Sequence, residues 1–175
     1  MIQRRSMLKL IALILLIVAL CAAAGFWAFR QTQAQRSGEL DLSGLTRPVT
    51  VYYDAWGIPH IDAQNDADAY RALGYLHAQD RLFQMDVLRR IGAGRLSELF
   101  GQESFQTDRF FRTLGISRFA RQYAERLESQ PDAAHVKLIT AYQDGINQYI
   151  DSGRVPLEYR LLLTRPDYFS LPDIA

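Results

Sequence analysis

Residues 65–91 read NDADAYRALGYLHAQDRLFQMDVLRRI, and this stretch decides the fold of the chain. Apolar residues recur along it at spacings of three and four, which predicts one long helix over residues 67–91. Asn65–Asp66 carries side chains that cap the first turn of a helix. Gly74 lowers the helical propensity of the middle, so we expect a break near residues 77–79.

A β-hairpin is predicted just before this helix. Residues 49–53 are rich in β-branched and aromatic side chains, which is typical of a strand, and residues 58–63 form a second candidate strand. The four residues Asp54–Gly57 between them have the composition of a turn. Pro59 lacks a backbone N–H and indicates an edge position for the second strand.

Helices are predicted for most of the remaining chain. Glycines at 92 and 94 end the long helix, and further helices are expected over residues 95–100, 106–112, 117–128 and 131–151. The last of these carries an apolar stripe made of Val136, Ile139, Ile146 and Ile150. The sequence therefore predicts an α+β chain that is mainly helical and has one N-terminal β-hairpin.

An uncharged apolar run precedes all of these elements. Residues 10–29 read LIALILLIVALCAAAGFWAF, which matches the roughly 30 Å hydrocarbon core of a bilayer when helical. Residues 1–9 are basic, which favours a cytoplasmic N-terminus and an exterior C-terminal part. The length favours an uncleaved signal anchor, whereas Ala22–Ala24 also fits a signal-peptidase site. Residues 30–47 then form a polar tether to a domain over residues 48–175.

Charge and cysteine content restrict the class of this domain. Residues 1–37 carry a net charge of +5 and residues 38–175 a net charge of −4. An acidic domain argues against nucleic acid as a partner. The one cysteine of the chain, Cys21, lies in the apolar run, so no disulfide is expected in the domain.

Searches for local catalytic motifs find none. The chain has no G-x-S-x-G elbow, H-E-x-x-H motif, P-loop or G-x-G-x-x-G motif. Its three histidines, at 60, 77 and 135, are spread over different predicted elements. We therefore expect no catalytic residue, no cofactor and no metal site within this chain.

A series of polar and glycine positions nevertheless forms a specific ordered pattern. Its parts are Asp54-x-x-Gly57-x-Pro59-His60-Ile61, Gly74-Tyr-Leu-His-Ala-Gln-Asp80-Arg81-Leu-Phe-Gln-Met-Asp86, Arg89-Arg90, Gly94-Arg-Leu-Ser-Glu98 and Asp144-Gly-Ile-Asn147. This pattern resembles the N-terminal part of the penicillin acylase family of N-terminal-nucleophile hydrolases, which includes cephalosporin and acyl-homoserine-lactone acylases. The resemblance covers residues 49–173.

The resemblance implies an exported precursor that cleaves itself into a small α and a large β subunit. The new N-terminal residue of the β subunit attacks a linear amide, with its own α-amine as base, and an acyl-enzyme forms. The nucleophile, the oxyanion donors and most ligands of a structural calcium would lie downstream of this chain. The implied fold is a four-layer αββα sandwich, to which this chain contributes the hairpin and helices.

The same resemblance implies the partners and the location. The partners are the downstream β subunit, the membrane through residues 10–29, and a small amide substrate of the full enzyme. The location is a bacterial inner membrane facing the periplasm, or the periplasm itself if the signal is cleaved. Leu171–Ala175 contains a helix-opening Pro-Asp pair directly before the end, so we expect further chain to complete the domain.

The matched residues are expected to have structural rather than chemical roles. Turn formation explains Asp54, Gly57 and Pro59, and His60 is expected to be buried and hydrogen-bonded. Asp80 and Arg81 are expected in a buried or half-buried charge network that fixes the long helix against the β subunit. The other matched positions with structural roles are Arg90, Gly94 and Glu98.

Two further groups have alternative interpretations. Arg89 and Arg90 are spaced to pair with Asp86, although they could also hold a carboxylate substrate. Four apolar residues are expected in the core, with an acyl-binding wall as the alternative: Tyr70, Tyr75, Phe83 and Met85. The alternative function for the whole chain is a membrane-tethered helical module that binds a partner and has no enzymatic activity.

Overall fold

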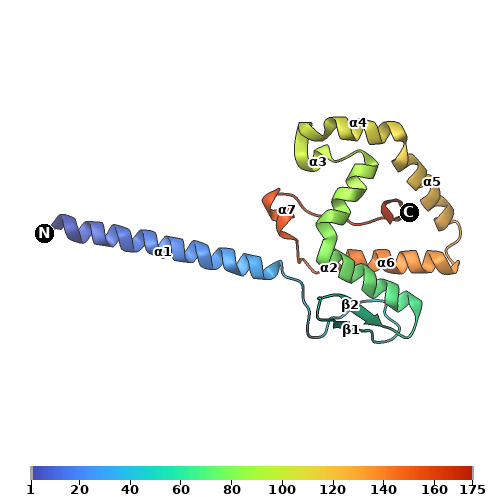
Figure 1. The fold of residues 1–175 in the computed structure, drawn as a ribbon, viewed down its shortest axis with the longest axis horizontal. Helices are drawn as coiled ribbons and strands as arrows, with labels where there is room; N and C mark the ends of the chain where they lie inside the picture. Colours follow the sequence, from blue (N-terminus) through green and yellow to red (C-terminus); the bar gives the residue numbers. More distant parts are fainter. Residues whose placement is uncertain (1, 175) are drawn as a thin grey trace. The chain divides into compact units, whose positions relative to one another are not determined.

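The computed structural model describes residues 2–174. These residues divide into two compact units, one ending at Gln33 and the other beginning at Ala34. The first unit is helix α1, Ile2–Gln31, drawn in blue in Figure 1. Its segment Lys9–Trp27 has a mean hydropathy of 2.8 and is long and apolar enough to cross a membrane, as a signal sequence also is. The predicted N-terminal apolar helix is therefore confirmed.

The first regular element of the second unit is the predicted hairpin. Strand β1, Thr50–Tyr53, pairs antiparallel with strand β2, Pro59–Asp62, in a two-stranded sheet. The turn between them places Gly57 at a φ of +75°, which glycine adopts without steric strain. The Asp54 carboxylate accepts hydrogen bonds from the backbone N–H groups of Trp56 and Ile58 at 2.8 and 2.9 Å. Turn chemistry thus fixes the hairpin, as predicted.

Helix α2, Asp66–Ala93, is the longest element of this unit. Its N-cap is Asn65, whose side chain accepts the backbone N–H of Asp68 at 2.9 Å, and Gly94 ends it in the left-handed conformation. The helix bends at Arg81, where φ is −142° and ψ is 16°, and the change of direction is visible in Figure 1. The break was predicted at residues 77–79, which is too early.

The prediction of a break rested on Gly74. In the structure this glycine is helical and lies where α2 crosses helix α6, Ala134–Asp151. A Cβ on Gly74 would lie 2.0 Å from the Tyr142 carbonyl oxygen, and one on Gly145 would lie 2.0 Å from the Arg71 carbonyl oxygen. Each glycine therefore faces the backbone of the other helix, and the absence of a Cβ at both positions allows the helices to approach closely.

The remaining helices complete the second unit. They are α3 (Ser97–Phe100), a 3₁₀ turn (Gly101–Ser104), α4 (Phe105–Leu114), α5 (Ile116–Glu128), α7 (Leu157–Leu161) and α8 (Leu171–Ile174). The predicted helices are confirmed, except that α6 starts at Ala134 rather than at Pro131, because Pro131–Ala133 forms a turn. In Figure 1, α3, α4 and α5 follow one another around the end of α2.

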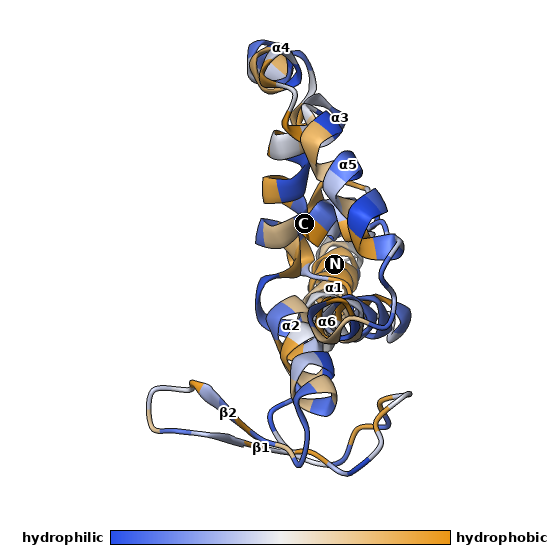
Figure 2. Ribbon diagram, turned by 90° about the vertical axis from the view of Figure 1, so that its right-hand side faces the viewer, coloured by the Kyte–Doolittle hydropathy of each residue, from blue (hydrophilic) through white to orange (hydrophobic). Residues whose placement is uncertain are grey.

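Several apolar side chains on α4 and α5 are uncovered. Phe110 and Phe119 are 59% and 65% exposed, and Figure 2 shows hydrophobic and hydrophilic residues mixed around α4. A helix with one apolar face normally buries it. Both side chains are therefore uncovered within the part of the chain that the structure describes.

The core lies where α2, α6, α7 and the C-terminal segment meet. Its buried members are Tyr75, Ala78, Leu82, Ile146, Tyr149, Tyr159 and Phe169. Tyr75 packs edge-on against Tyr149, with ring centroids 5.5 Å apart. Of the four apolar residues expected in the core, Tyr75 is buried within it, and Phe83 and Met85 are partly buried and pack against the core cluster. Tyr70 is 41% exposed, so its placement in the core is wrong.

Part of the segment assigned as a tether, residues 34–47, belongs to the second unit and makes hydrogen bonds to its helices. The backbone N–H of Gln35 donates to Gln79, and that of Ser43 donates to Gln148. The buried Asp68 carboxylate accepts four hydrogen bonds from three residues of the chain: Thr46 (N and Oγ1), Arg47 (N) and Asn65 (Nδ2). Residues 43–47 are therefore fixed along the start of α2.

The α2–α6 crossing makes a testable prediction. Gly74→Ala should destabilise the purified chain by about 3 kcal/mol, because the added methyl group forces the two helix backbones apart. Gly92→Ala in the same helix is the matched control, since its Cβ would meet nothing closer than 3.8 Å. The control should be stabilised by about 0.5–1 kcal/mol. Urea unfolding measures both, and equal effects of the two substitutions would contradict the account.

The Asp68 anchor predicts a pH dependence. The backbone N–H of Thr46, with the other donors, lowers the pKa of Asp68 from 3.8 to about 2. A lowered carboxylate pKa contributes stability that is complete above 3.8 and is lost as the pH falls towards 2. The protection factor of the Thr46 amide in hydrogen exchange, relative to its intrinsic rate at each pH, should therefore fall over this range. In Asp68→Asn the exchange should already be fast at pH 5; unchanged protection in that variant would argue against the anchor.

Candidate functional site

The end of α2 contains the principal charge cluster of the second unit. The Asp86 side chain is fully buried, and its Oδ1 accepts the Nε–H groups of Arg89 at 2.7 Å and Arg90 at 3.0 Å. Its Oδ2 accepts the hydroxyl of Tyr159 from α7 at 2.9 Å. Both carboxylate oxygens are thus satisfied, as a buried charge requires. The predicted pairing of Asp86 with both arginines is confirmed.

Arg90 extends the cluster to two other segments. Its guanidinium, 6% exposed, donates to Glu98 of α3 and to Asp167 at 3.1 Å. A hydrogen bond from Arg95 lowers the pKa of Glu98, and the charge of Arg90 adds to the effect. Arg90 therefore joins α2, α3 and the C-terminal segment through three carboxylates.

Arg89 holds the C-terminal segment by its backbone. Its guanidinium donates to the carbonyl oxygens of Tyr168 and Asp167, both at 2.9 Å. It also lies 4.1 Å from the ring centroid of Phe169 and 3.5 Å from Asp173 of α8. The alternative role of Arg89 and Arg90 as a substrate-carboxylate site finds no support, because the donors of both are used within the chain.

Tyr159 completes the cluster from α7. Burial raises the pKa of its phenol, and the neighbouring Asp86 carboxylate raises the pKa further. The hydroxyl therefore remains protonated and donates to Asp86 over the whole physiological range. It serves as a fixed hydrogen-bond donor rather than as an acid or base near neutral pH.

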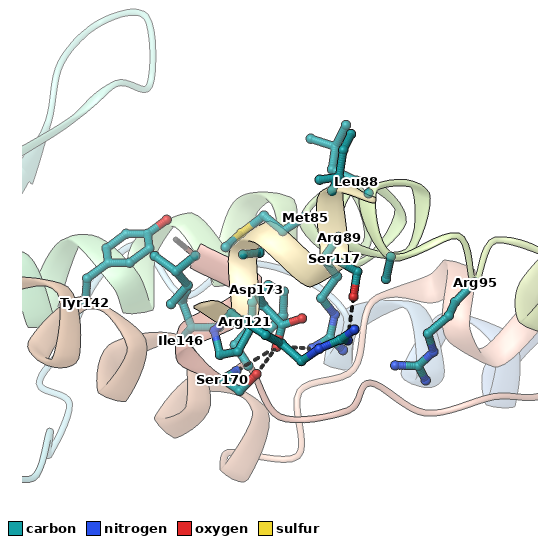
Figure 3. A pocket seen from close by; sticks show the side chains of 17 residues that line it. Met85, Leu88, Arg89, Arg95, Ser117, Arg121, Tyr142, Ile146, Ser170 and Asp173 are labelled. Atoms are coloured by element: carbon teal, nitrogen blue, oxygen red, sulfur yellow. Dashed lines mark hydrogen bonds and ion pairs between the residues drawn. The ribbon is translucent and has the colours of Figure 1, made fainter. Parts of the chain in front are cut away.

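A groove of about 700 Å³ lies beside this cluster, between α2, α5, α6 and α8. Figure 3 shows Met85 and Leu88 of α2, Arg121 and Ser117 of α5, and Asp173 of α8 around it. Arg121 donates to the Ser117 hydroxyl at 2.7 Å. The Ser170 hydroxyl donates to Asp173 at 2.6 Å. The lining thus combines apolar side chains with arginines.

The groove lacks the parts of a hydrolytic site. Neither Ser117 nor Ser170 has a histidine partner among the described residues, and a serine needs an adjacent base to act as a nucleophile. His77 bonds to the hydroxyl of Tyr142 at 3.0 Å. Residues 2–174 also place no three His, Cys, Asp or Glu side chains where they could hold a metal ion.

The matched residues of the hairpin lie together at its turn. His60 Nε2 lies 3.3 Å from Asp54 Oδ2, and its ring stacks on Tyr52 with centroids 4.9 Å apart. The His60 side chain is 45% exposed, so the prediction that it is buried is wrong, whereas its hydrogen bond is confirmed. Pro59 pairs with Tyr53 at the end of the ladder. The Tyr52 ring covers one face of the His60 imidazole, and the two-stranded ribbon leaves the rest of the side chain exposed.

Asp80 and Arg81 are not buried within this chain. Both side chains are exposed. Arg81 Nη1 donates a hydrogen bond to Oε1 of the nearby Gln84 at 3.3 Å. The bend at Arg81 turns these side chains outwards, which sequence periodicity for a straight helix does not capture. The buried network lies one and a half turns later, at Asp86. A contact of Asp80 and Arg81 with a downstream subunit stays a prediction.

Gly94 and Asp108 hold helix α4 against the end of α2 and the start of α3, which the sequence analysis did not predict. A Cβ on Gly94 would lie 2.7 Å from the Asp108 carbonyl oxygen, so the α2 end packs tightly on α4. The Asp108 carboxylate accepts the backbone N–H groups of Leu96 and Ser97 at 2.6 and 2.9 Å. Local sequence contains no sign that Tyr159, Asp167 and Asp68 form hydrogen bonds, because their partners Asp86, Arg90 and Thr46 lie far away in the sequence.

Comparisons with known proteins agree with this arrangement. Residues 48–175 match the Penicillin amidase family. The chain is 45% identical over 132 residues to a penicillin acylase 2 proenzyme from a Pseudomonas species, covering 75% of this chain and 16% of the relative. It is 35% identical over 141 residues to acyl-homoserine lactone acylase QuiP of Pseudomonas aeruginosa, covering 79% and 16%.

A solved structure gives the same result. Penicillin G acylase from Alcaligenes faecalis matches with a TM-score of 0.63 and 27% identity, over 74% of this chain and 69% of that chain. The mainly helical fold with one hairpin is therefore confirmed. The chain spans about a sixth of the length of the curated relatives described above.

The charge cluster makes a mutational prediction. Asp86→Ala should destabilise the chain by about 3–5 kcal/mol, because two buried arginines lose their common carboxylate. Asp80→Ala, on the exposed side of the same helix, is the matched control and should change stability by less than about 0.5 kcal/mol. Chemical denaturation measures both variants. A mild effect of Asp86→Ala, similar to that of the control, would show that the cluster does not hold the segments together.

Proposed function

Because the chain belongs to the penicillin amidase family, we propose that it is the N-terminal, non-catalytic part of an amidohydrolase precursor. The observation that carries this proposal is the family match over residues 48–175. The chain covers only 16% of the penicillin acylase 2 proenzyme to which it is similar. The described residues of this part supply no nucleophile–base pair. We propose that the reactive residue lies in chain downstream of residue 175, as the resemblance to the family implies.

The proposed chemistry is hydrolysis of a linear amide. Self-cleavage of the precursor frees a hydroxyl or thiol residue at the N-terminus of a β subunit, whose α-amine acts as the base. The carbonyl carbon is attacked, the amine leaves, and water releases the carboxylic acid. The role of this chain is to supply a rigid support, since the Asp86 cluster and the α2–α6 crossing fix its helices. The complete fold is proposed to be a four-layer αββα sandwich.

Two substrate classes are consistent with the relatives. One relative is named a penicillin acylase and another an acyl-homoserine lactone acylase, so the proposed substrate is a small amide of either class. A structural calcium is proposed only for the full enzyme, with most of its ligands outside this chain. Nucleic acid is not proposed as a partner, because residues 38–175 have a net charge of −4.

The proposed location is the exterior face of a bacterial inner membrane, or the periplasm. The apolar helix α1 supports either a signal anchor or a signal peptide. A signal anchor leaves the mature α subunit tethered, whereas cleavage after Ala24 releases it. N-terminal sequencing of the mature α subunit distinguishes the two: retention of residues 1–24 indicates an anchor, and a start at Gly25 indicates cleavage.

Amidase assays test the proposed function. The protein encoded by the complete reading frame should hydrolyse penicillin G or a long-chain acyl-homoserine lactone, and the purified 175-residue chain should hydrolyse neither. Amine release is measured with a fluorogenic amine reagent. Turnover by the 175-residue chain would contradict the non-catalytic role. A stop codon after Ala175 with a stable, inactive product would instead favour the membrane-tethered partner-binding module.

A further inference from the structure

The turn that ends α7 exposes consecutive leucines. Residues 160–165 read RLLLTR, and Leu161, Leu162 and Leu163 are 72%, 36% and 94% exposed. Single exposed leucines are normal on a protein surface, but three in a row at a turn are not explained by packing. Leu161 and Leu163 are mostly exposed, and none of the three leucines belongs to the core cluster.

The backbone at Leu163 strengthens this observation. Its φ is +52°, and it is the one non-glycine residue with positive φ among those described. The N–H of Thr164 bonds to the Tyr159 carbonyl at 3.0 Å and that of Leu163 to the Arg160 carbonyl at 3.3 Å, which is the helix-ending pattern that favours glycine. Leucine is strained there and gains no packing, so its side chain is expected to act outside this unit.

The leucines are flanked by positive charge. Residues 154–165 contain three arginines and one acidic residue, Glu158. Arg160 and Arg165 border the leucines directly, both are exposed, and neither has an ion-pair partner among the described residues. An apolar tip bordered by free arginines matches the interface between acyl chains and anionic headgroups.

The turn also follows the residue that contacts the membrane-proximal chain. Arg154 Nη2 donates to Gln35 Oε1 at 2.6 Å, and both belong to the second unit. Gln35 comes four residues after Gln31, the end of α1, so the chain between them reaches about 14 Å at most. Only a few residues of chain therefore separate the end of α1 from the residue that bonds to Arg154.

We propose that the Leu161–Leu163 turn, with Arg160 and Arg165, is a second membrane contact that binds an anionic lipid surface. This proposal rests on the proposed membrane location of α1. It gives the strained leucine a purpose, since the side chains enter the acyl region while the guanidinium groups bind lipid phosphates. Lipid is favoured over a protein partner because the surface is a small protruding tip rather than a flat apolar face.

Site-directed fluorescence tests the contact. The full-length protein, with residues 1–31 attached and Cys21 replaced by alanine, is labelled with an environment-sensitive dye at Leu161→Cys. It is reconstituted into vesicles of phosphatidylethanolamine and phosphatidylglycerol that carry headgroup-proximal nitroxide lipid. The matched control is Phe119→Cys, which labels an equally exposed apolar site on α5. The dye at 161 should show a blue-shifted emission and several-fold stronger nitroxide quenching than the dye at 119.

Leu163→Gly serves as a second variant. Glycine suits the positive φ, so the fold should be retained while the most exposed leucine is lost. In this background the quenching at 161 should fall towards the level at 119. Equal quenching at the two sites overturns the proposal. A blue-shifted but unquenched dye also overturns it, because protein and not lipid then covers the tip.

Amidase activity in the same vesicles separates the two proposals. Retained activity without quenching at 161 rejects the lipid contact alone. Quenching without activity supports the lipid contact and rejects the proposed hydrolase function.

Discussion

The buried Asp86 carboxylate is the interaction on which the rest of the second unit depends. It lies on α2 and binds Arg89 and Arg90 from the same helix and Tyr159 from α7. Those arginines in turn hold the C-terminal segment through Asp167. Removing one buried charge would leave the opposite charges uncompensated in a nonpolar environment. One carboxylate therefore determines how three separate parts of the chain are placed.

Much of the fold could be predicted from local sequence. The hairpin follows from two short β-rich runs around the Asp54–Gly57 turn, and both ends of α2 follow from Asn65 and Gly94. The pairing of Asp86 with its two arginines also follows, because spacings of three and four residues place side chains on one face of a helix. These features depend on neighbours within a few residues, which a single sequence displays directly.

Features that depend on distant partners could not be predicted in this way. The sequence around Tyr159 gives no sign that its hydroxyl meets Asp86, 73 residues away. Gly74 reads as a weak point of a helix, yet its function is to admit the backbone of α6. The helix bends at Arg81, where a helical sequence pattern gives no sign of a bend. In each case tertiary packing overrides the local signal.

The central claim is that this chain is the support for a nucleophile carried elsewhere on the same precursor. Intact-mass analysis and N-terminal sequencing of the purified full-length product test it most directly. The account predicts two chains, the smaller containing residues 34–175 and the larger beginning with a residue that bears a hydroxyl or thiol group. A single uncleaved chain with full amidase activity would contradict it.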